Sequence, residues 1–252
     1  MTQQIIKNSL NEKKVCLIIP TYNSESTIEY VISDCLNYSE NIIVVNDGTT
    51  DNTLNIINKF QEQISIVSYP KNKGKGFALK QGFKEAISQG FDYAITIDAD
   101  GQHFSADIEL FVNELKKNEN AFIIGSRKFT NSNMPEKNKF ANRFSNFWFT
   151  IQTFKYLPDT QTGFRLYPLK NFKEFKPLTN RYEAELEMLV RCAWHNVKIV
   201  PIFINVFYPE KENRISHFNP KKDFLKISIL NAVLCILALI YGYPSMLIRK
   251  IF

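Results

Sequence analysis

Short runs of apolar residues alternate, along the first half of the chain, with segments whose apolar residues recur at helical spacing. Unbroken apolar runs are typical of strands buried on both faces of a sheet, and spacings of three and four residues predict helices. Their regular succession predicts an α/β fold, a mostly parallel sheet flanked by helices. The expected strands occupy residues 14–20, 41–47, 64–70, 91–98 and 121–127, and the expected helices occupy 24–36, 50–60, 75–90 and 105–117.

The second half has a less regular pattern. An aromatic-rich helix is expected over 139–157, and a helix that begins with several glutamates over 181–195. Residues 159–167 are interpreted as a loop leading into a strand, and residues 197–208 as one or two strands. Residues 209–223 are predicted to form a polar loop.

The segment from Ile227 to Tyr243 contains no charged residue. As a helix it would be about 25 Å long, just short of a hydrocarbon core of about 30 Å. The segment could be a core helix, an interfacial helix or a marginal span, and basic residues flank it on both sides. We favour membrane attachment because a soluble helix with no charge over 17 residues at a chain end is unusual. The aromatic helix could lie at the same interface or fill the core. We therefore divide the chain into a domain over 1–220 and a hydrophobic, membrane-associating segment over 221–252.

Composition narrows the class of partner. The chain has 252 residues, 44% of them hydrophobic, and a formal net charge of +6. That charge suits an anionic partner such as a phosphate ligand or an acidic membrane, while the lack of a dense Lys/Arg block gives no support for nucleic-acid binding. The four cysteines form no C-x-x-C pair, which favours buried thiols in a reducing compartment. The first residues lack the apolar stretch of a secretory signal.

Polar residues gather directly after the expected strands, at 20–25, 46–51, 98–103 and 125–128. The carboxyl ends of parallel strands meet at one edge of a sheet, which is where ligands bind in open α/β folds. The sequence therefore predicts a ligand site built from these clusters.

Asp98 and Asp100 follow the strand at 91–98 at a spacing that could point both carboxylates the same way. Two unpaired like charges there cost stability, which suggests a cationic partner. Paired carboxylates suit Mg²⁺ or Mn²⁺, ions that substrate phosphates usually complete, and Gln102 continues the spacing with a further oxygen. The alternative, a solvated pair of loop aspartates, is weakened by the neighbouring polar clusters.

Two further motifs have both a functional and a purely structural interpretation. Asp47 begins an Asp-Gly turn, and it could either serve that turn alone or accept hydrogen bonds from a nucleotide base or ribose. The stretch at 72–83, which contains Lys75, places glycines and lysines at a helix start. It could cradle a phosphate, or the glycines could allow close packing of the helix. The P-loop and dinucleotide fingerprints are both absent from the sequence.

Eight short motifs follow one another along the chain: IIPTYNSE, VVNDGTTDNT, NKGKGFALKQGF, DADGQH, GSR, QTGFRLY, RYEAELEM and NRISHF. This ordered set resembles family 2 inverting glycosyltransferases, and within them the dolichyl-phosphate mannosyltransferase-like and polyprenyl-phosphate glycosyltransferase branch. The resemblance runs from about Lys14 to about Phe218. It implies a GT-A fold, a nucleotide-sugar donor and a divalent metal ion, Mg²⁺ or Mn²⁺.

The resemblance also implies individual roles. Pro20, Tyr22 and Glu25 would line the base pocket, and Asp47 would contact the base or ribose. Asp98 would contact the nucleotide, and Asp100 and Gln102 would bind the metal. Phosphate oxygens of donor or acceptor would be contacted by Arg127, Arg165 and Arg214, and a loop closing over the donor would include Ser216 and His217. Many relatives have an acidic residue or Asn where this chain has Ser24, so the role of Glu25 is less secure than that of Asp47.

The acceptor decides whether a catalytic base is needed. A lipid phosphate is largely ionised at pH 7, since its second pKa is about 6, whereas a hydroxyl requires a carboxylate base. Glu183 and Asp159 are the candidate bases. Glu183 and Glu187 are expected to share one helix face, with Glu185 pointing elsewhere, and a solvated acidic helix start is the alternative.

The expected activity is transfer of a hexose from a GDP- or UDP-linked donor to a membrane lipid, such as polyprenyl phosphate, at the cytoplasmic face. A nucleotidyltransferase is the rival enzyme, but no Gly- and Arg-rich loop follows the first strand. A membrane-bound nucleotide-sugar-binding scaffold is the non-enzymatic rival. The sequence leaves the sugar, the base and the oligomeric state open.

Overall fold

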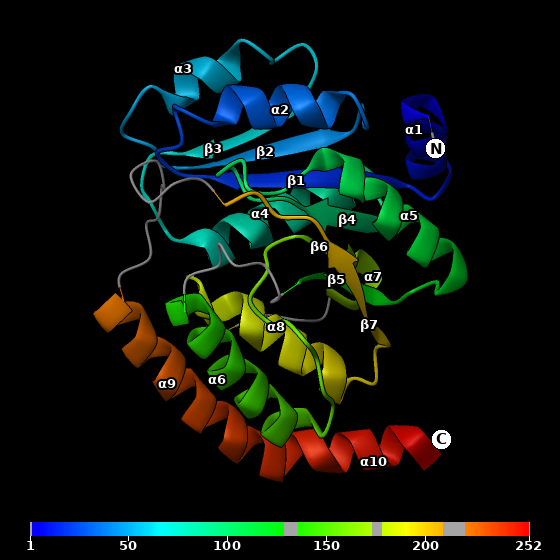
Figure 1. The fold of residues 1–252 in the computed structure, drawn as a ribbon, viewed down its shortest axis with the longest axis vertical. Helices are drawn as coiled ribbons and strands as arrows, with labels where there is room; N and C mark the ends of the chain where they lie inside the picture. Colours follow the sequence, from blue (N-terminus) through cyan, green and yellow to red (C-terminus); the bar gives the residue numbers. More distant parts are fainter. Residues whose placement is uncertain (1, 129–135, 173–177, 209–219, 252) are drawn as a thin grey trace.

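The computed structural model describes residues 2–128, 136–172, 178–208 and 220–251 (Figure 1). Within them, seven strands form one sheet in the order β3-β2-β1-β4-β6-β5-β7. The strands are β1 (Val15–Thr21), β2 (Ile42–Asp47), β3 (Ser65–Tyr69), β4 (Tyr93–Thr96), β5 (Phe122–Arg127), β6 (Arg165–Pro168) and β7 (Ile199–Ile204).

The helices connect and cover these strands. They are α1 (Gln3–Glu12), α2 (Ile28–Leu36), α3 (Thr53–Asn58), α4 (Lys75–Ser88), the 3-10 turn η1 (Ser105–Asp107), α5 (Ile108–Lys117), α6 (Glu136–Thr153), α7 (Leu169–Phe172), α8 (Glu183–Trp194), α9 (Pro220–Leu237), the π-helical turn η3 (Ala238–Gly242) and α10 (Tyr243–Ile251).

The predicted α/β class and mostly parallel sheet are confirmed. β1 pairs in parallel with β2 and β4, β2 with β3, and β5 with β7. β6 runs antiparallel between β4 and β5, an orientation that the sequence did not indicate. The expected second strand of 197–208 is reduced to an isolated bridge between Val206 and His103.

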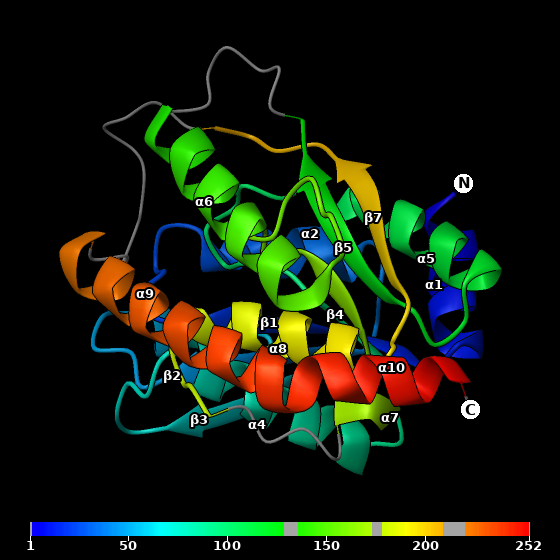
Figure 2. The same ribbon diagram turned by 90° about the horizontal axis from the view of Figure 1, so that it is seen from below.

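Alternation along the buried strands divides the core into two layers. Cys16 and Ile18 of β1 face the layer under α4, α6, α8 and α9, whereas Leu17 and Ile19 face the layer under α1, α2, α3 and α5. Every residue of β1 and β2 is buried, as expected for strands covered on both faces. Figures 1 and 2 show the helices on the two sides of the sheet.

The C-terminal helices lie along the outside of the second layer. One face of this segment packs into the core through Leu230, Leu234 and Ala238. The chain changes direction between α9 and α10 (Figure 1). In η3, at this bend, Gly242 lies so close to Trp194 that a Cβ would come within 2.5 Å of the indole. Pro244 follows the bend; because it lacks an N–H, it cannot make the regular helical bond there. The division at residue 220 stays a prediction.

Candidate functional site

A cavity of about 400 Å³ opens at the carboxyl ends of β1, β2 and β4. Three of the predicted polar clusters meet there, as the parallel arrangement of these strands requires. Its walls also include the start of α4 and the residues just before α8. The lining residues are Pro20, Thr21, Tyr22, Ser24, Asp47, Asn72, Gly74, Lys75, Ala78, Asp98, Ala99, Asp100, Arg181 and Tyr182.

A buried ammonium joins two carboxylates in this cavity. Lys75 Nζ lies 2.7 Å from Asp98 Oδ1 and 2.9 Å from Glu185 Oε2. Burial alone would lower the pKa of Lys75, but the two carboxylates raise it above its ordinary value. Burial would raise the pKa of Asp98, yet Lys75, and after it His103, lower it. Lys75 and Asp98 are therefore both charged at neutral pH.

Asp100 differs from Asp98 in its electrostatic environment. Burial and the nearby charge of Asp98 raise the pKa of Asp100 to about 6, against the opposing hydrogen bond from the backbone N–H of Gln102 to Oδ1 at 3.0 Å. The predicted close pair of carboxylates is thus present at the cavity wall. Lys75 compensates Asp98, whereas the charge of Asp100 is only weakly compensated by the protein.

This donor set fits a hard divalent cation. In the described ranges, no group of three or more His, Cys, Asp or Glu side chains could hold a metal unaided. A pair of carboxylates supplemented by substrate phosphates and water is the usual arrangement for Mg²⁺. Gln102 meets Asp100 through its backbone amide, and its side chain does not line the cavity, so its predicted role as a metal ligand stays a prediction.

The residues predicted for the base pocket divide into two groups. Pro20, Tyr22 and Asp47 line the cavity. Asp47 also organises the loop before α4, because its carboxylate oxygens accept the backbone N–H groups of Lys73 and Gly74 at 2.8 Å. Glu25 is exposed away from the cavity and accepts the N–H of Asn52 at 3.0 Å, so in this structure it lies outside the pocket assigned to it.

The glycines at the start of α4 allow close packing. A Cβ on Gly74 would lie 2.7 Å from the carbonyl oxygen of Asn180, and one on Gly76 would lie 2.2 Å from the Cβ of Ala184. The segment that packs against the start of α4 is therefore the chain entering α8. The backbone N–H of Phe77 donates to that same Asn180 carbonyl at 2.9 Å. Of the two interpretations of this stretch, the structure supports close packing of the helix start.

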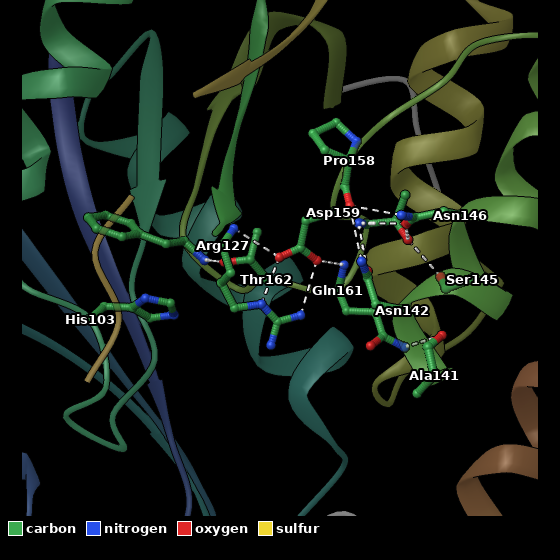
Figure 3. Close-up of polar contacts among 12 residues, drawn as sticks. His103, Arg127, Ala141, Asn142, Ser145, Asn146, Pro158, Asp159, Gln161 and Thr162 are labelled. Atoms are coloured by element: carbon green, nitrogen blue, oxygen red, sulfur yellow. Dashed lines mark hydrogen bonds and ion pairs between the residues drawn. The ribbon is translucent and has the colours of Figure 1, made fainter. Parts of the chain in front are cut away.

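Arg127 and Asp159 form a buried bidentate pair (Figure 3). Asp159 Oδ2 accepts Arg127 Nε at 2.7 Å, and Oδ1 accepts Nη2 at 3.0 Å. The carboxylate also accepts the backbone N–H groups of Arg127 and Gln161. Asp159 is fully buried and its oxygens are already engaged, so the structure argues against the catalytic base predicted there. The Arg127 guanidinium is held by Asp159, and its predicted contact with phosphate stays a prediction.

Arg165 is also placed differently from the prediction. It is 1% exposed, and its guanidinium donates to the backbone carbonyls of Thr162, Glu185 and Thr160 at 2.6, 2.8 and 2.9 Å. A buried cation needs this degree of hydrogen bonding to offset its lost hydration. Arg165 therefore fixes the 160–165 loop to α8. The phosphate contact predicted for Arg165 would require it to face the cavity, but it is not among the residues that line it.

The glutamates of α8 are all buried, which rules out the solvated acidic helix start. Glu187 accepts the backbone N–H groups of Leu178 and Thr179 at 2.8 and 2.9 Å and pairs with Arg191. Glu183 is buried but does not line the cavity. Glu185, expected to point elsewhere, is the one that reaches Lys75.

Some residues at or near the cavity were not predicted from the sequence, and some predicted site residues lie outside the described part of the chain. Glu185, Arg181 and Tyr182 all lie in the RYEAELEM motif, but helical spacing alone singled out Glu183 and Glu187. His103, buried 4.0 Å from Asp98, was missed because an isolated histidine carries no spacing signal. Arg214, Ser216 and His217 lie outside the described residues.

Comparison with known proteins agrees with this geometry. The family model described as Glycosyl transferase family 2 matches residues 16–175. UDP-N-acetylglucosamine--dolichyl-phosphate N-acetylglucosaminyltransferase of Methanococcus voltae is 30% identical over 222 residues, 79% of this chain and 88% of the relative. Dolichyl-phosphate beta-glucosyltransferase of Dictyostelium discoideum is 26% identical over 225 residues, 79% and 68% of the two chains.

A solved structure shows the same fold. Glucosyl-3-phosphoglycerate synthase from Mycobacterium tuberculosis, in complex with Mn²⁺, UDP-glucose and phosphoglyceric acid, matches with a TM-score of 0.67 at 16% identity. The match covers 94% of this chain and 84% of that one, which confirms the predicted GT-A fold. Since the family model spans more than half of the sequence and a relative of 30% identity matches most of it, the chain belongs to glycosyl transferase family 2 and is a glycosyltransferase.

Proposed function

We propose that this glycosyltransferase moves a hexose from a nucleotide sugar to a polyprenyl-phosphate lipid, with inversion at the anomeric carbon. The observation that carries the proposal is the cavity in which Asp98 and Asp100 lie at the same sheet edge as Tyr22 and Asp47. Two relatives are named as transferases to dolichyl phosphate, one of them with a UDP-linked donor, and the solved neighbour holds UDP-glucose. We therefore favour UDP over GDP.

Two groups of lining residues would contact different parts of the donor. Pro20, Tyr22 and Asp47 would contact the base and ribose, and Asp98 and Asp100 would hold Mg²⁺ or Mn²⁺ beside the diphosphate. The bound ion would supply stabilisation of the negative charge that develops on the leaving diphosphate. Lys75 keeps Asp98 ionised and fixed in place, so the carboxylates need little rearrangement when the donor binds.

The placement of the two predicted bases, Asp159 and Glu183, favours a phosphate acceptor. Asp159 already accepts hydrogen bonds on both oxygens, and Glu183 is buried away from the cavity wall. A hydroxyl acceptor would need a carboxylate within hydrogen-bonding reach of its proton. A lipid phosphate is already an ionised nucleophile at neutral pH, so it needs only to be positioned opposite the leaving group.

We further propose that the C-terminal segment attaches the enzyme to the cytoplasmic face of a membrane by lying in the interface. One helical stretch of the described chain, Leu225–Arg249, is long and apolar enough to cross a bilayer. However, it bends at η3, and its inner face packs on α6 and α8 (Figure 2). A span would draw those helices into the hydrocarbon core, whereas an interfacial position keeps them outside it.

The outer face of this segment is apolar, which is what lipid contact requires. Ile236 and Ile240 are 58% and 72% exposed, and the adjoining α6 exposes Phe140 and Phe147. An exposed apolar surface continuing over neighbouring helices is typical of a binding face. In this proposal the aromatic helix contributes to both predicted environments, since Phe149 on its other side is buried in the core.

A transfer assay tests the proposal. Purified protein with Mn²⁺ would be incubated with UDP- and GDP-sugars and either a polyprenyl phosphate or the matching polyprenol. We expect release of a nucleoside diphosphate and a glycosylated lipid only with the phosphate acceptor, and loss of both when EDTA replaces Mn²⁺. Equal transfer to the polyprenol would favour the hydroxyl alternative. Turnover unaffected by EDTA would contradict the metal assignment.

A further inference from the structure

Protein atoms already cover the start of α4, the place where the sequence suggested a phosphate cradle. The N–H of Phe77 donates to the carbonyl of Asn180, and a Cβ on Gly74 would touch the side chain of Arg181, 2.7 Å from its Cγ. The chain entering α8 thus packs against the helix start, and it brings Arg181 to the cavity wall. A cationic side chain that can bind an anion therefore lies beside the helix start.

The charges that line the cavity are not balanced by the protein. Asp47, Asp98 and Asp100 contribute carboxylates, and Lys75 and Arg181 contribute cations. The Lys75 ammonium forms ion pairs with Asp98 and Glu185. Arg181 is exposed, and within the described residues it has no acidic partner. It is therefore the lining cation whose charge remains available to a ligand.

The backbone before Arg181 is held from two sides. Glu187 of α8 accepts the N–H groups of Leu178 and Thr179, and Lys80 of α4 donates to the carbonyl of Thr179 and to Asn180 Oδ1, each at 2.8 Å. This anchoring fixes the backbone from which the exposed Arg181 side chain extends. A backbone that is already fixed reduces the entropy lost when a ligand binds.

We propose that Arg181 binds a substrate phosphate, either of the donor diphosphate or of the lipid acceptor. Guanidinium suits this role because it is always charged and can donate two parallel hydrogen bonds to phosphate oxygens. The inference rests on the proposed function, since it assumes that the cavity receives a nucleotide sugar. It goes further by assigning the phosphate contact to Arg181, whereas the sequence placed it on Arg127 and Arg165.

The test compares Arg181→Ala and Arg181→Lys with Arg143→Ala, which removes an exposed arginine of α6 outside the cavity lining. Calorimetry with Mn²⁺ would measure binding of inorganic pyrophosphate, UDP, GDP and uridine, and steady-state assays would give KM for a short-chain polyprenyl phosphate. If the contact is with the donor, Arg181→Ala weakens diphosphate binding about tenfold or more and leaves uridine unchanged. If it is with the acceptor, KM for the lipid phosphate rises by a similar factor while diphosphate binding is unchanged.

Either result supports the inference, provided that Arg181→Lys falls between wild type and Ala and that Arg143→Ala matches wild type. Wild-type affinities and lipid KM in Arg181→Ala would overturn it while leaving the proposed function intact. A wild-type protein that binds no diphosphate and transfers no sugar would overturn both. Unchanged thermal midpoints would establish that the exposed substitution leaves the fold intact.

Discussion

Lys75 at the start of α4 and Asp98 after β4 form a buried ion pair, with 2.7 Å between Nζ and Oδ1. Glu185 of α8 completes a triad around the same ammonium. The pair joins segments that the sequence separates by a helix and a strand, and it lies at the wall of the cavity. The Lys75 charge therefore stabilises the fold at the place where the donor is proposed to bind.

Replacing Lys75 with Met should destabilise the protein strongly, because Asp98 and Glu185 would lose the ammonium that both contact in a largely buried place. Loss of one partner from a buried pair costs about 3–5 kcal/mol, and we expect the lower end because both groups retain some exposure. Urea unfolding followed by circular dichroism would measure the change. Lys75→Arg should recover part of the loss.

An exposed ion pair provides the matched control for that substitution. Lys13 and Glu119 form a salt bridge at the surface, and Lys13→Met removes the same charge where water can replace the partner. We expect almost no change in the urea midpoint. If the two Lys→Met variants lost equal stability, the buried triad would have no special role.

Gly163 sets the position of Asp98 from the opposite side. A Cβ at residue 163 would lie 2.3 Å from Asp98 Oδ2 and 2.6 Å from Oδ1, closer than atoms can approach. Gly163→Ala should therefore displace the carboxylate and lower Mn²⁺-dependent transfer by at least tenfold. Titration with Mn²⁺ in the presence of UDP would show whether metal affinity falls in parallel.

Gly90→Ala is a suitable comparison because Gly90 has a φ of +85° but open space around it. It should cost about 1 kcal/mol of stability from backbone strain and leave turnover unchanged. Full activity in Gly163→Ala would show that Asp98 tolerates displacement, and the proposed arrangement of the carboxylates would then be wrong.

The fold was predictable because its signals are local. Apolar runs such as 41–47 and helical spacings such as 105–117 follow directly from burial on one or two faces. α1 was missed because its buried side is small, with only Ile6, Ser9 and Leu10 buried. The antiparallel direction of β6 and the bend at η3 depend on long-range packing, which no local pattern records.

The site was predictable as far as strand ends determine it. Asp98, Asp100, Asp47 and Tyr22 follow strands, so a parallel sheet necessarily brings them together. The sequence could not show how Arg127 and Arg165 are held, because it does not reveal that Asp159 pairs with the first and that backbone carbonyls accept the guanidinium of the second. Glu185 was missed for the same reason, since its partner lies on another helix.

Replacing Asp100 with Asn should stabilise the metal-free protein while abolishing metal-dependent transfer. The pKa of Asp100 is raised to about 6 in the folded state, so between about pH 4 and pH 6 the folded protein holds a proton that the unfolded chain has released. Stability contributed by this group therefore falls as pH rises through that window and stays low above it. The Asn variant should gain on the order of 3 kcal/mol at pH 8 and little at pH 4.

Urea unfolding in EDTA at both pH values would measure this difference, with the wild type as reference. Transfer with Mn²⁺ should fall about a hundredfold or more in the same variant, because a neutral amide binds a divalent ion far more weakly than a carboxylate does. A gain of equal size at pH 4 and pH 8 would show that the effect does not come from ionisation of Asp100.

The apolar outer face of the C-terminal segment should determine membrane binding without affecting nucleotide binding. Ile236→Glu combined with Ile240→Glu places two charges on that exposed face, so sedimentation with vesicles of phosphatidylcholine and phosphatidylglycerol should weaken on the order of a hundredfold. Affinity for UDP with Mn²⁺ should not change, because neither residue lines the cavity. Ile5→Glu, on α1 across the sheet, is the control and should bind vesicles as wild type does. Undiminished sedimentation of the double variant would mean that another surface meets the lipid, and the interfacial position of α9 and α10 would have to be abandoned.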